Sequence, residues 1–329
     1  MKKVIYIEKG IKDAPRTKSI LKKFKNPIII IIDRYSEVFN KKNQNFRLQK
    51  KNPAIIIAKK YKNFLLETPS TYSIGRRNNY YFSYMYNCLF DCRYCFLQGM
   101  YNSANFVIFI NYEDFFKEVR GLDKSEIAKD TTIFTGYDCD SLAYDNITNF
   151  SSFLLGYLSE FNDIEIEIRT KSTYLKPFYR RGLDNIVLAF SFTPEKFSTK
   201  YELGVAHFKK RIAALKKVVQ FGWKIGIRLD PFVIYKGWEY DYKELLKILF
   251  SIIPRDQIHS VTYGNIRYPK KVFTNIKKIY PEENLFLKFD NNKKNIYDED
   301  NGELIDSFCK NHLFKHLDNS KIFCNIHEK

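Results

Sequence analysis

The feature that most constrains the fold of this chain is a regular alternation of short apolar segments with longer amphipathic ones over residues 80–264. Repeated β–α units of this kind imply a parallel sheet with helices outside it. About six units predict an α/β fold, an incomplete (β/α)6 TIM-like barrel whose chemistry lies at the C-terminal ends of the strands. The strand-like segments, rich in β-branched and aromatic residues, are 80–85, 105–110, 131–135, 164–169, 186–192, 224–229 and 259–264.

The first 75 residues predict a small α/β unit of their own. Apolar segments at 4–8, 28–33 and 53–60 are typical of buried parallel strands. Residues 1–62 carry 18 basic and four acidic side chains, a net +14 of the chain's +18. This charge indicates a polyanionic partner such as nucleic acid, unless it reflects a generally lysine-rich composition. We expect a basic N-terminal α/β unit over 1–75, a partial barrel over 76–285 and a C-terminal extension over 286–329.

Composition excludes several classes of protein. With 45% hydrophobic residues the chain can bury a large core, so global disorder is not expected. No apolar run approaches the ~20 residues of a membrane span, and the N-terminal segment becomes charged again too soon for a signal peptide. We therefore expect a cytoplasmic protein without membrane association. In such a chain the six cysteines are not expected to form disulfides.

Three of these cysteines, Cys88, Cys92 and Cys95, have the spacing C-x3-C-x2-C and follow directly on the strand expected at 80–85. Three thiolates on one short loop can bind three irons of a 4Fe–4S cluster and leave the fourth iron open for a cofactor. A structural zinc site is the alternative, but zinc usually has four protein ligands. The first histidine of the chain, His207, is distant in sequence. The spacing therefore predicts an iron–sulfur cluster.

With this motif the chain resembles the spore photoproduct lyase family of the radical S-adenosylmethionine superfamily. The resemblance is carried by NCLFDCRYCFLQG at 87–99 and NFVIFINYEDFF at 105–116. It covers most of residues 3–275 through further blocks: VIYIEKG, IRTKST, LAFSFTPE, FKKRIAALKKVVQFGWKIGIRLDPFVIYKGW and NIRYPKKV.

The resemblance implies a light-independent DNA repair lyase that uses a 4Fe–4S cluster and S-adenosylmethionine. Such an enzyme reverses spore photoproduct, a thymine pair joined by a methylene bridge. A 5'-deoxyadenosyl radical removes a hydrogen atom from the lesion, the bridge breaks, and a cysteine returns a hydrogen atom to the thymine. The implied partners are DNA containing thymine photoproducts and an electron donor such as flavodoxin or ferredoxin.

The resemblance also implies roles for single residues. The three cysteines of the motif match the cluster ligands. Cys139 matches the cysteine that returns the hydrogen atom, and Ser141, two residues later, matches a serine near the cofactor. Lys171, in RTKST, and Ser191, in LAFSF, match residues that contact the cofactor.

Two positions of the cysteine motif concern the relay of hydrogen atoms. Tyr94 matches a tyrosine that helps this relay in the family. The family has a second tyrosine directly after the third cysteine, where this chain has Phe96. Phenylalanine has no hydroxyl group and cannot pass on a hydrogen atom. This departure indicates either a shorter relay or a different substrate.

The residues around Cys139 suit a hydrogen donor. Cys139 follows the strand expected at 131–135, which places it at the mouth of the barrel, and its weak S–H bond can quench a carbon radical. The carboxylates of Asp138 and Asp140 are expected to raise the pKa of the thiol and keep it in the S–H form. The alternative is a small, buried apolar cysteine. Lys171 can pair with a cofactor carboxylate as a compact cation, or be a solvated charge.

Residues 265–280, NIRYPKKVFTNIKKIY, combine cations with aromatic side chains. Cations neutralise phosphates and aromatic rings stack on bases, and a crosslinked thymine pair must leave the duplex to reach a barrel mouth. Arg267 also matches a basic residue near the family's DNA-contacting hairpin. The stretch predicts either a DNA contact through Arg267, Lys270 and Lys271 or an amphipathic surface helix with its aromatic residues in the core.

Two other functions stay open at this point. The first is a radical enzyme that acts on another nucleic-acid substrate, which Phe96 favours. The second is a DNA-binding protein whose cluster is not catalytic, which the lack of a fourth nearby thiolate disfavours.

Overall fold

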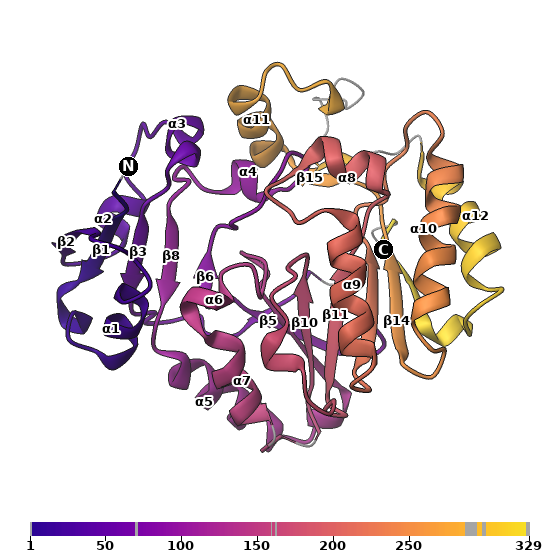
Figure 1. Cartoon of the computed structure of the whole chain (residues 1–329), viewed down its shortest axis with the longest axis horizontal. Helices are drawn as coiled ribbons and strands as arrows, with labels where there is room; N and C mark the ends of the chain where they lie inside the picture. The colour runs from indigo at the N-terminus through magenta and orange to yellow at the C-terminus, as the bar shows by residue number, and fades with distance from the viewer. Residues whose placement is uncertain are drawn as a thin grey trace.

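The computed structural model of the chain describes residues 2–69, 72–158, 160–161, 163–286, 295–297 and 301–326. These residues form two mainly parallel β-sheets with helices packed around them, as the alternating pattern predicts (Figure 1). The N-terminal sheet lies at the left of the picture, and the larger, curled sheet fills its centre. None of the described helices is long and apolar enough to cross a membrane.

The first sheet has five strands in the order β2-β1-β3-β8-β6, and all neighbours are parallel except β6 and β8. The continuous apolar runs of β3 and β8 are fully buried, as in strands covered on both faces. The elements are β1 (Val4–Glu8), α1 (Pro15–Leu21), β2 (Ile28–Ile32), α2 (Ser36–Phe39), α3 (Phe46–Lys51), β3 (Ile55–Ala58), β6 (Met85–Tyr86) and β8 (Phe106–Phe109).

Two expectations about these strands are wrong. The segment at 28–33 forms a parallel strand, but its isoleucines Ile28 to Ile31 are 39–48% exposed because β2 lies at the edge of the sheet. The segment at 105–110 forms β8, which pairs with β3 in the first sheet instead of joining the barrel. An apolar run indicates a strand but does not select its pairing partner. The first sheet therefore draws on residues from both sides of position 75.

The second sheet is the incomplete (β/α)6 TIM-like barrel that the sequence predicts. Its order is β17-β14-β13-β11-β10-β9-β5-β4, and the six strands from β14 to β5 are all parallel neighbours. The edge strand β17 is also parallel, and β4 is antiparallel. The strands are β4 (Leu66–Glu67), β5 (Asn78–Phe82), β9 (Thr131–Thr135), β10 (Glu165–Thr170), β11 (Ile186–Ser191), β13 (Lys224–Leu229), β14 (Ile258–Tyr263) and β17 (Ile322–Cys324).

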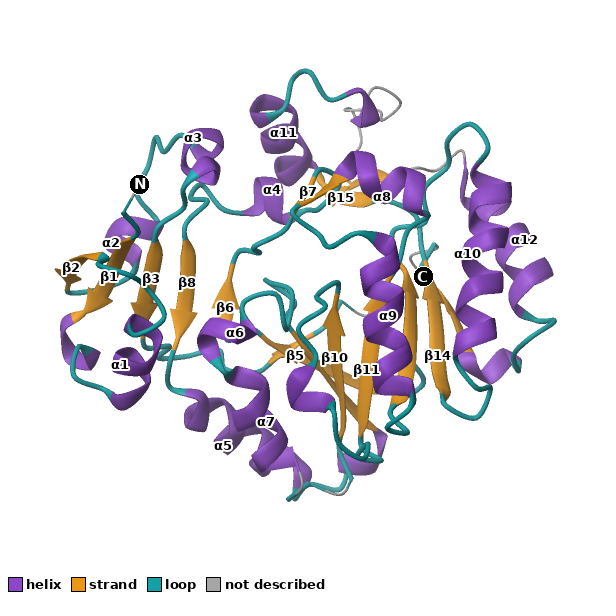
Figure 2. Cartoon of the chain, viewed as in Figure 1, coloured by secondary structure: helices purple, strands orange, loops and turns teal. Residues whose placement is uncertain are grey.

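Helices cover the outside of the curled sheet. These helices are α5 (Tyr112–Asp123), α7 (Phe150–Leu158), α9 (Phe208–Val219), α10 (Trp238–Ile252) and α12 (Gly302–Leu313). The connecting segments contain β7 (Asp91–Cys92), α4 (Leu97–Met100), α6 (Asp145–Thr148), α8 (Glu195–Tyr201), β12 (Glu202–Leu203), β15 (Arg267–Pro269), α11 (Lys270–Ile279) and β16 (Asn295–Tyr297). Figure 2 shows α4, α8, β7 and β15 at the end to which the arrows of β10, β11 and β14 point. In barrels of this kind the functional site lies at that end.

A buried ion pair lies inside the barrel sheet. Arg228 of β13 and Glu167 of β10 have no exposed side-chain surface, and their Nη2 and Oε2 atoms are 2.6 Å apart. Arg228 also donates a hydrogen bond to the hydroxyl of Ser260 at 2.9 Å. Gly226 leaves room for the guanidinium, because a Cβ there would come within 2.6 Å of Nη2. Each buried charge therefore has the partner that its burial requires.

Candidate active site

The cysteine motif lies on the loop that connects β6 to α4. At the start of this loop Asn87 adopts a left-handed conformation with φ 65°. Its side-chain amide donates to the carbonyls of Ser103 and Asn105 at 2.8 and 2.7 Å. Further along the loop, strand β7 pairs with strand β12, and Cys92 lies opposite Glu202 in this pairing. Hydrogen bonds to the rest of the protein therefore fix the loop at two separate points.

The three thiols of the motif are free, with Cys92 buried and Cys88 and Cys95 half-buried. Burial raises the pKa of all three, to about 12 for Cys88, and the charge of Lys171 opposes the shift for the other two. In the described part of the chain, no three His, Cys, Asp or Glu side chains converge where one metal ion could bind. A cubane cluster instead takes one thiolate at each of three irons. The three thiols on this loop fit the ligand set of a 4Fe–4S cluster.

A buried carboxylate, Glu202, connects the cysteine loop to the barrel. It accepts hydrogen bonds from the hydroxyl of Tyr94, from Nη1 of Arg211 at 3.0 Å and from the hydroxyl of Ser198 at 2.6 Å. The Nζ atom of Lys171 lies 3.8 Å from its Oε1 atom. Burial disfavours the ionised form, but the charges of Lys171 and Arg211 and these hydrogen bonds outweigh it and lower the pKa of Glu202. No sequence motif identifies Glu202, because only its partners, which are distant in sequence, distinguish it from a surface glutamate.

Cys139 lies in the turn after β9, as predicted, and only 6% of its surface is exposed. Burial raises the pKa of its thiol well above the ordinary value, and the charges of Cys88, Asp138 and Asp140 add to this shift. The expected effect of the two flanking carboxylates is thus confirmed in direction, although burial contributes more. The electrostatic influence of Cys88 indicates that Cys139 lies beside the cysteine loop. Its thiol is held in the S–H form.

Asp140 joins the turn of Cys139 to the turn that carries Lys171. One carboxylate oxygen of Asp140 accepts hydrogen bonds from the N–H of Leu142 at 2.9 Å and from the hydroxyl of Thr170 at 2.6 Å. The other oxygen accepts from the N–H of Lys171 at 2.6 Å. These bonds fix the two turns relative to each other. The turn that carries Cys139 and the turn that carries Lys171 therefore lie next to each other.

The two serines predicted to contact the cofactor use their hydroxyls inside the protein. Ser141 is fully buried and donates to the carbonyl of Thr135 at 2.8 Å. Gly136, with φ +75°, makes this possible, because a Cβ there would come within 2.5 Å of the Ser141 hydroxyl. Ser191, the last residue of β11, accepts a hydrogen bond from Nε of Arg169 at 2.9 Å. Contact of either serine with the cofactor stays a prediction.

The cations and aromatic residues of segment 265–280 occupy different environments. Lys270 and Lys271, at the start of α11, are exposed. Arg267 is half-buried and donates to the carbonyl of Asn325 at 3.1 Å. The aromatic residues are buried in a hydrophobic cluster beside the cysteine loop: Tyr268, Phe273 and Tyr280. These three rings therefore follow the amphipathic-helix alternative and do not present a surface for a base, while DNA contact by the cations stays a prediction.

Helix α11 packs directly on α4, the helix that follows the cysteine motif. Gly99 allows this close approach, because a Cβ there would lie 2.3 Å from the carbonyl oxygen of Val272. The side-chain amide of Asn275 donates to the Gly99 carbonyl at 2.9 Å, and the hydroxyl of Tyr268 donates to the Tyr94 carbonyl at 2.6 Å. The segment with the candidate DNA-binding cations is therefore in direct contact with the cysteine loop.

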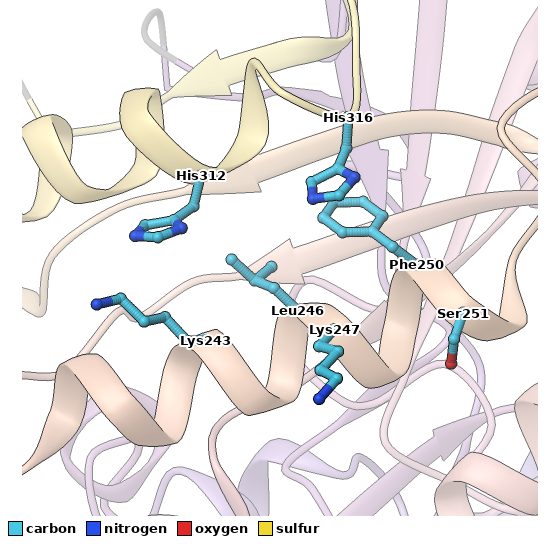
Figure 3. Close-up of a pocket in the computed structure, with 7 residues that line it drawn as sticks. All are labelled: Lys243, Leu246, Lys247, Phe250, Ser251, His312 and His316. Carbon is cyan, nitrogen blue, oxygen red and sulfur yellow. The ribbon is translucent and has the colours of Figure 1, made fainter.

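A separate groove lies between α10 and α12 at the C-terminal edge of the barrel (Figure 3). It is lined by Lys243 and Lys247 of α10 and by His312 and His316, and the His316 ring stacks on Phe250 with centroids 4.5 Å apart. The groove contains none of the residues that the sequence analysis assigned to the site.

The comparisons with known proteins agree on one family. A family model described as spore photoproduct lyase matches residues 1–323. The spore photoproduct lyase of Bacillus subtilis (strain 168) is 23% identical over 337 residues, which cover 97% of this chain and 96% of that protein. The spore photoproduct lyase of Clostridium acetobutylicum is 24% identical, over 95% of each chain.

Solved structures of spore photoproduct lyase have the same fold. A mutant with one cysteine-to-alanine and one serine-to-cysteine change, with bound AdoMet and dinucleoside spore photoproduct, matches with a TM-score of 0.79 at 17% sequence identity. The match covers 100% of this chain and 99% of that one. A tyrosine-to-phenylalanine mutant matches with a TM-score of 0.80 at 18% identity, over 100% and 99% of the two chains.

Proposed function

Because this chain belongs to the spore photoproduct lyase family, we propose that it repairs spore photoproduct in DNA as a light-independent radical S-adenosylmethionine lyase. The observation that carries the proposal is the buried, protonated thiol of Cys139 beside the loop of the three motif cysteines. AdoMet and dinucleoside spore photoproduct are bound in a related solved structure. The same cofactor and the same lesion, within DNA, are proposed for this protein.

The cofactors would be held at the C-terminal ends of the barrel strands. A 4Fe–4S cluster on Cys88, Cys92 and Cys95, together with S-adenosylmethionine, would supply the 5'-deoxyadenosyl radical that removes a hydrogen atom from the lesion. Lys171 offers a compact cation for the carboxylate of the cofactor. Glu202, 3.8 Å from the lysine Nζ, orients that cation.

Cys139 acts after the methylene bridge of the lesion has broken. Its S–H bond breaks, its hydrogen atom forms a C–H bond on the thymine radical, and the unpaired electron moves to sulfur. Burial beside two carboxylates keeps the thiol protonated and therefore ready for this transfer. The hydroxyl of Tyr94, which is hydrogen-bonded to Glu202, is proposed to take part in the relay that returns a hydrogen atom to the sulfur.

This chemistry also bears on the electron donor of the enzyme and on its location in the cell. Reductive cleavage of S-adenosylmethionine needs a single-electron donor, and a protein such as flavodoxin or ferredoxin is proposed for this role. A DNA substrate and such a donor agree with a cytoplasmic enzyme.

The test is a repair assay with the cluster reconstituted under anaerobic conditions. Dithionite, S-adenosylmethionine and DNA containing spore photoproduct are added, and the released thymines are measured by mass spectrometry. The Cys139→Ala variant should still form 5'-deoxyadenosine but give misrouted thymine products. Cys309→Ala, which removes a buried cysteine of α12, should repair like the unmodified protein. Clean thymine repair by Cys139→Ala would show that Cys139 is not the donor.

Phe96 supports one alternative within the same superfamily, a radical enzyme that acts on another nucleic-acid lesion. Formation of 5'-deoxyadenosine without repair of any thymine dimer would favour this alternative. If no 5'-deoxyadenosine forms after reduction, the cluster has no catalytic role.

A further inference from the structure

Three aromatic rings form a row next to Cys139. Tyr137 directly follows Gly136 in the turn after β9, and 36% of its surface is exposed. Its ring stacks on Tyr81 of β5 with centroids 4.3 Å apart and an interplanar angle of 29°. The Tyr137 ring also contacts Phe96, and the centroids of these two rings are 5.6 Å apart. The row therefore joins the turn of Cys139 to the residue after the last motif cysteine.

These rings are not simply part of the core. Neighbouring residues of a strand point to opposite faces, and Phe82, next to Tyr81, packs on Phe115 of α5 and Phe150 of α7 outside the sheet. Tyr81 therefore points to the inner face of the curled sheet. Both Tyr81 and Tyr137 lie outside the two buried hydrophobic clusters of the described residues. A stacked, partly exposed tyrosine pair on the inner face of a barrel is available to a ligand.

Positive charge lies close to this row. Burial and the charge of Asp138 raise the pKa of Tyr137, and the charge of Arg267 opposes the shift. Arg267 is therefore near enough to act electrostatically on the Tyr137 hydroxyl. The exposed part of this aromatic row, with Arg267 near it, is suited to a nucleotide, because a base can pack on an aromatic ring and a cation neutralises phosphate.

We propose that Tyr137 and Tyr81, extended by Phe96, form an aromatic shelf on which a pyrimidine base of the extruded lesion stacks. This inference rests on the proposed function and specifies how its substrate is held. Tyr137 of the shelf is two positions before Cys139 in the same turn, so a base on the shelf would lie near the hydrogen donor. Stacking needs a ring and no hydroxyl group, and Phe96 therefore serves the shelf although it cannot relay a hydrogen atom.

Binding of the isolated lesion tests the shelf without turnover. Dinucleoside spore photoproduct is titrated calorimetrically into cluster-loaded protein that contains S-adenosylmethionine but no reductant. Tyr137→Ala and Tyr81→Ala should each weaken binding roughly 5- to 150-fold, the usual effect of removing one stacked aromatic ring. Tyr137→Phe and Tyr81→Phe keep the ring and should bind within about twofold of the unmodified protein. Tyr240→Ala, on the exposed side of α10, is the control and should not change binding.

Two results would overturn the shelf. In the first, Tyr137→Ala binds the dinucleoside lesion as tightly as the unmodified protein does. In the second, Tyr137→Phe loses as much affinity for the lesion as Tyr137→Ala. Urea unfolding of each variant shows whether it is folded, and Tyr81→Ala repeats the test at a second position. Thymine release is measured in parallel. If the unmodified protein releases no thymine but lesion binding depends on the rings, the proposed function is contradicted and the shelf is supported. If the unmodified protein repairs the lesion but binding does not depend on the rings, the proposed function stands and the shelf is wrong.

Discussion

Replacing Glu202 by glutamine removes a charge that the structure buries between two cations. Glutamine keeps the shape of the side chain, but it leaves Arg211 and Lys171, with side chains 2% and 13% exposed, without their anion. Removing one partner of a buried ion pair costs about 3–5 kcal/mol, because the other charge stays buried and uncompensated. The amide oxygen can still accept a hydrogen bond from Tyr94, and Lys171 is partly solvated. We therefore expect a loss near ~3 kcal/mol.

Urea unfolding followed by tryptophan fluorescence measures this loss. With a slope of ~3 kcal/mol/M, a loss of ~3 kcal/mol lowers the midpoint by about 1 M urea. Glu160→Gln is the matched control, because Glu160 pairs with Arg120 and the two side chains are 55% and 46% exposed. Exposed pairs contribute ~0–1 kcal/mol. If Glu202→Gln shifts the midpoint no more than this control does, Glu202 does not stabilise the two buried cations.

The same variant has a predictable pH dependence. The pKa of Glu202 lies below its ordinary value of 4.5 in the folded protein. A carboxylate with a lowered folded pKa stabilises the protein above its unfolded pKa and loses this contribution as the pH falls through the folded pKa. The difference in stability between the unmodified protein and Glu202→Gln should be constant near neutral pH and shrink at pH values below about 4. A difference at about pH 3 as large as at neutral pH would show that the pKa of Glu202 is not lowered in the folded protein.

Three further perturbations test other parts of the structure. Gly99→Ala should cost about 1–3 kcal/mol in urea unfolding, because the methyl group forces α4 and α11 apart, and an unchanged midpoint would argue against the close packing. Arg228→Met should cost about 3–5 kcal/mol by leaving Glu167 buried and unpaired, and Arg228→Met with Glu167→Met should recover most of it; a double variant as unstable as the single one would exclude this explanation. Alanine at Lys270 or Lys271 should lower the slope of log K against log salt for DNA by about one unit each in fluorescence anisotropy, and an unchanged slope would exclude a phosphate contact.

The sequence by itself determined the features that depend on residues close together along the chain. Strand β1 and the barrel strands β9, β10, β11, β13 and β14 form where apolar segments predict them, because the period of side chains is a local property. The strand expected at 80–85 instead divides into β5 of the barrel and β6 of the first sheet. The spacing of Cys88, Cys92 and Cys95 places three thiols on one short segment, whatever the fold around it. The carboxylates of Asp138 and Asp140, next to Cys139 in sequence, contribute to the raised pKa of its thiol, although burial contributes more.

Only the tertiary structure decided which distant segments meet. Apolar runs of similar composition became an exposed edge in β2 and a buried strand in β8, and β8 joined the first sheet instead of the barrel. Glu202 became part of the site because Tyr94, 108 residues away in sequence, lies against it. The stack of Tyr137 on Tyr81 likewise depends on the pairing of β5 with β9. Such contacts are set by the free energy of the whole packed chain, which no local window of sequence contains.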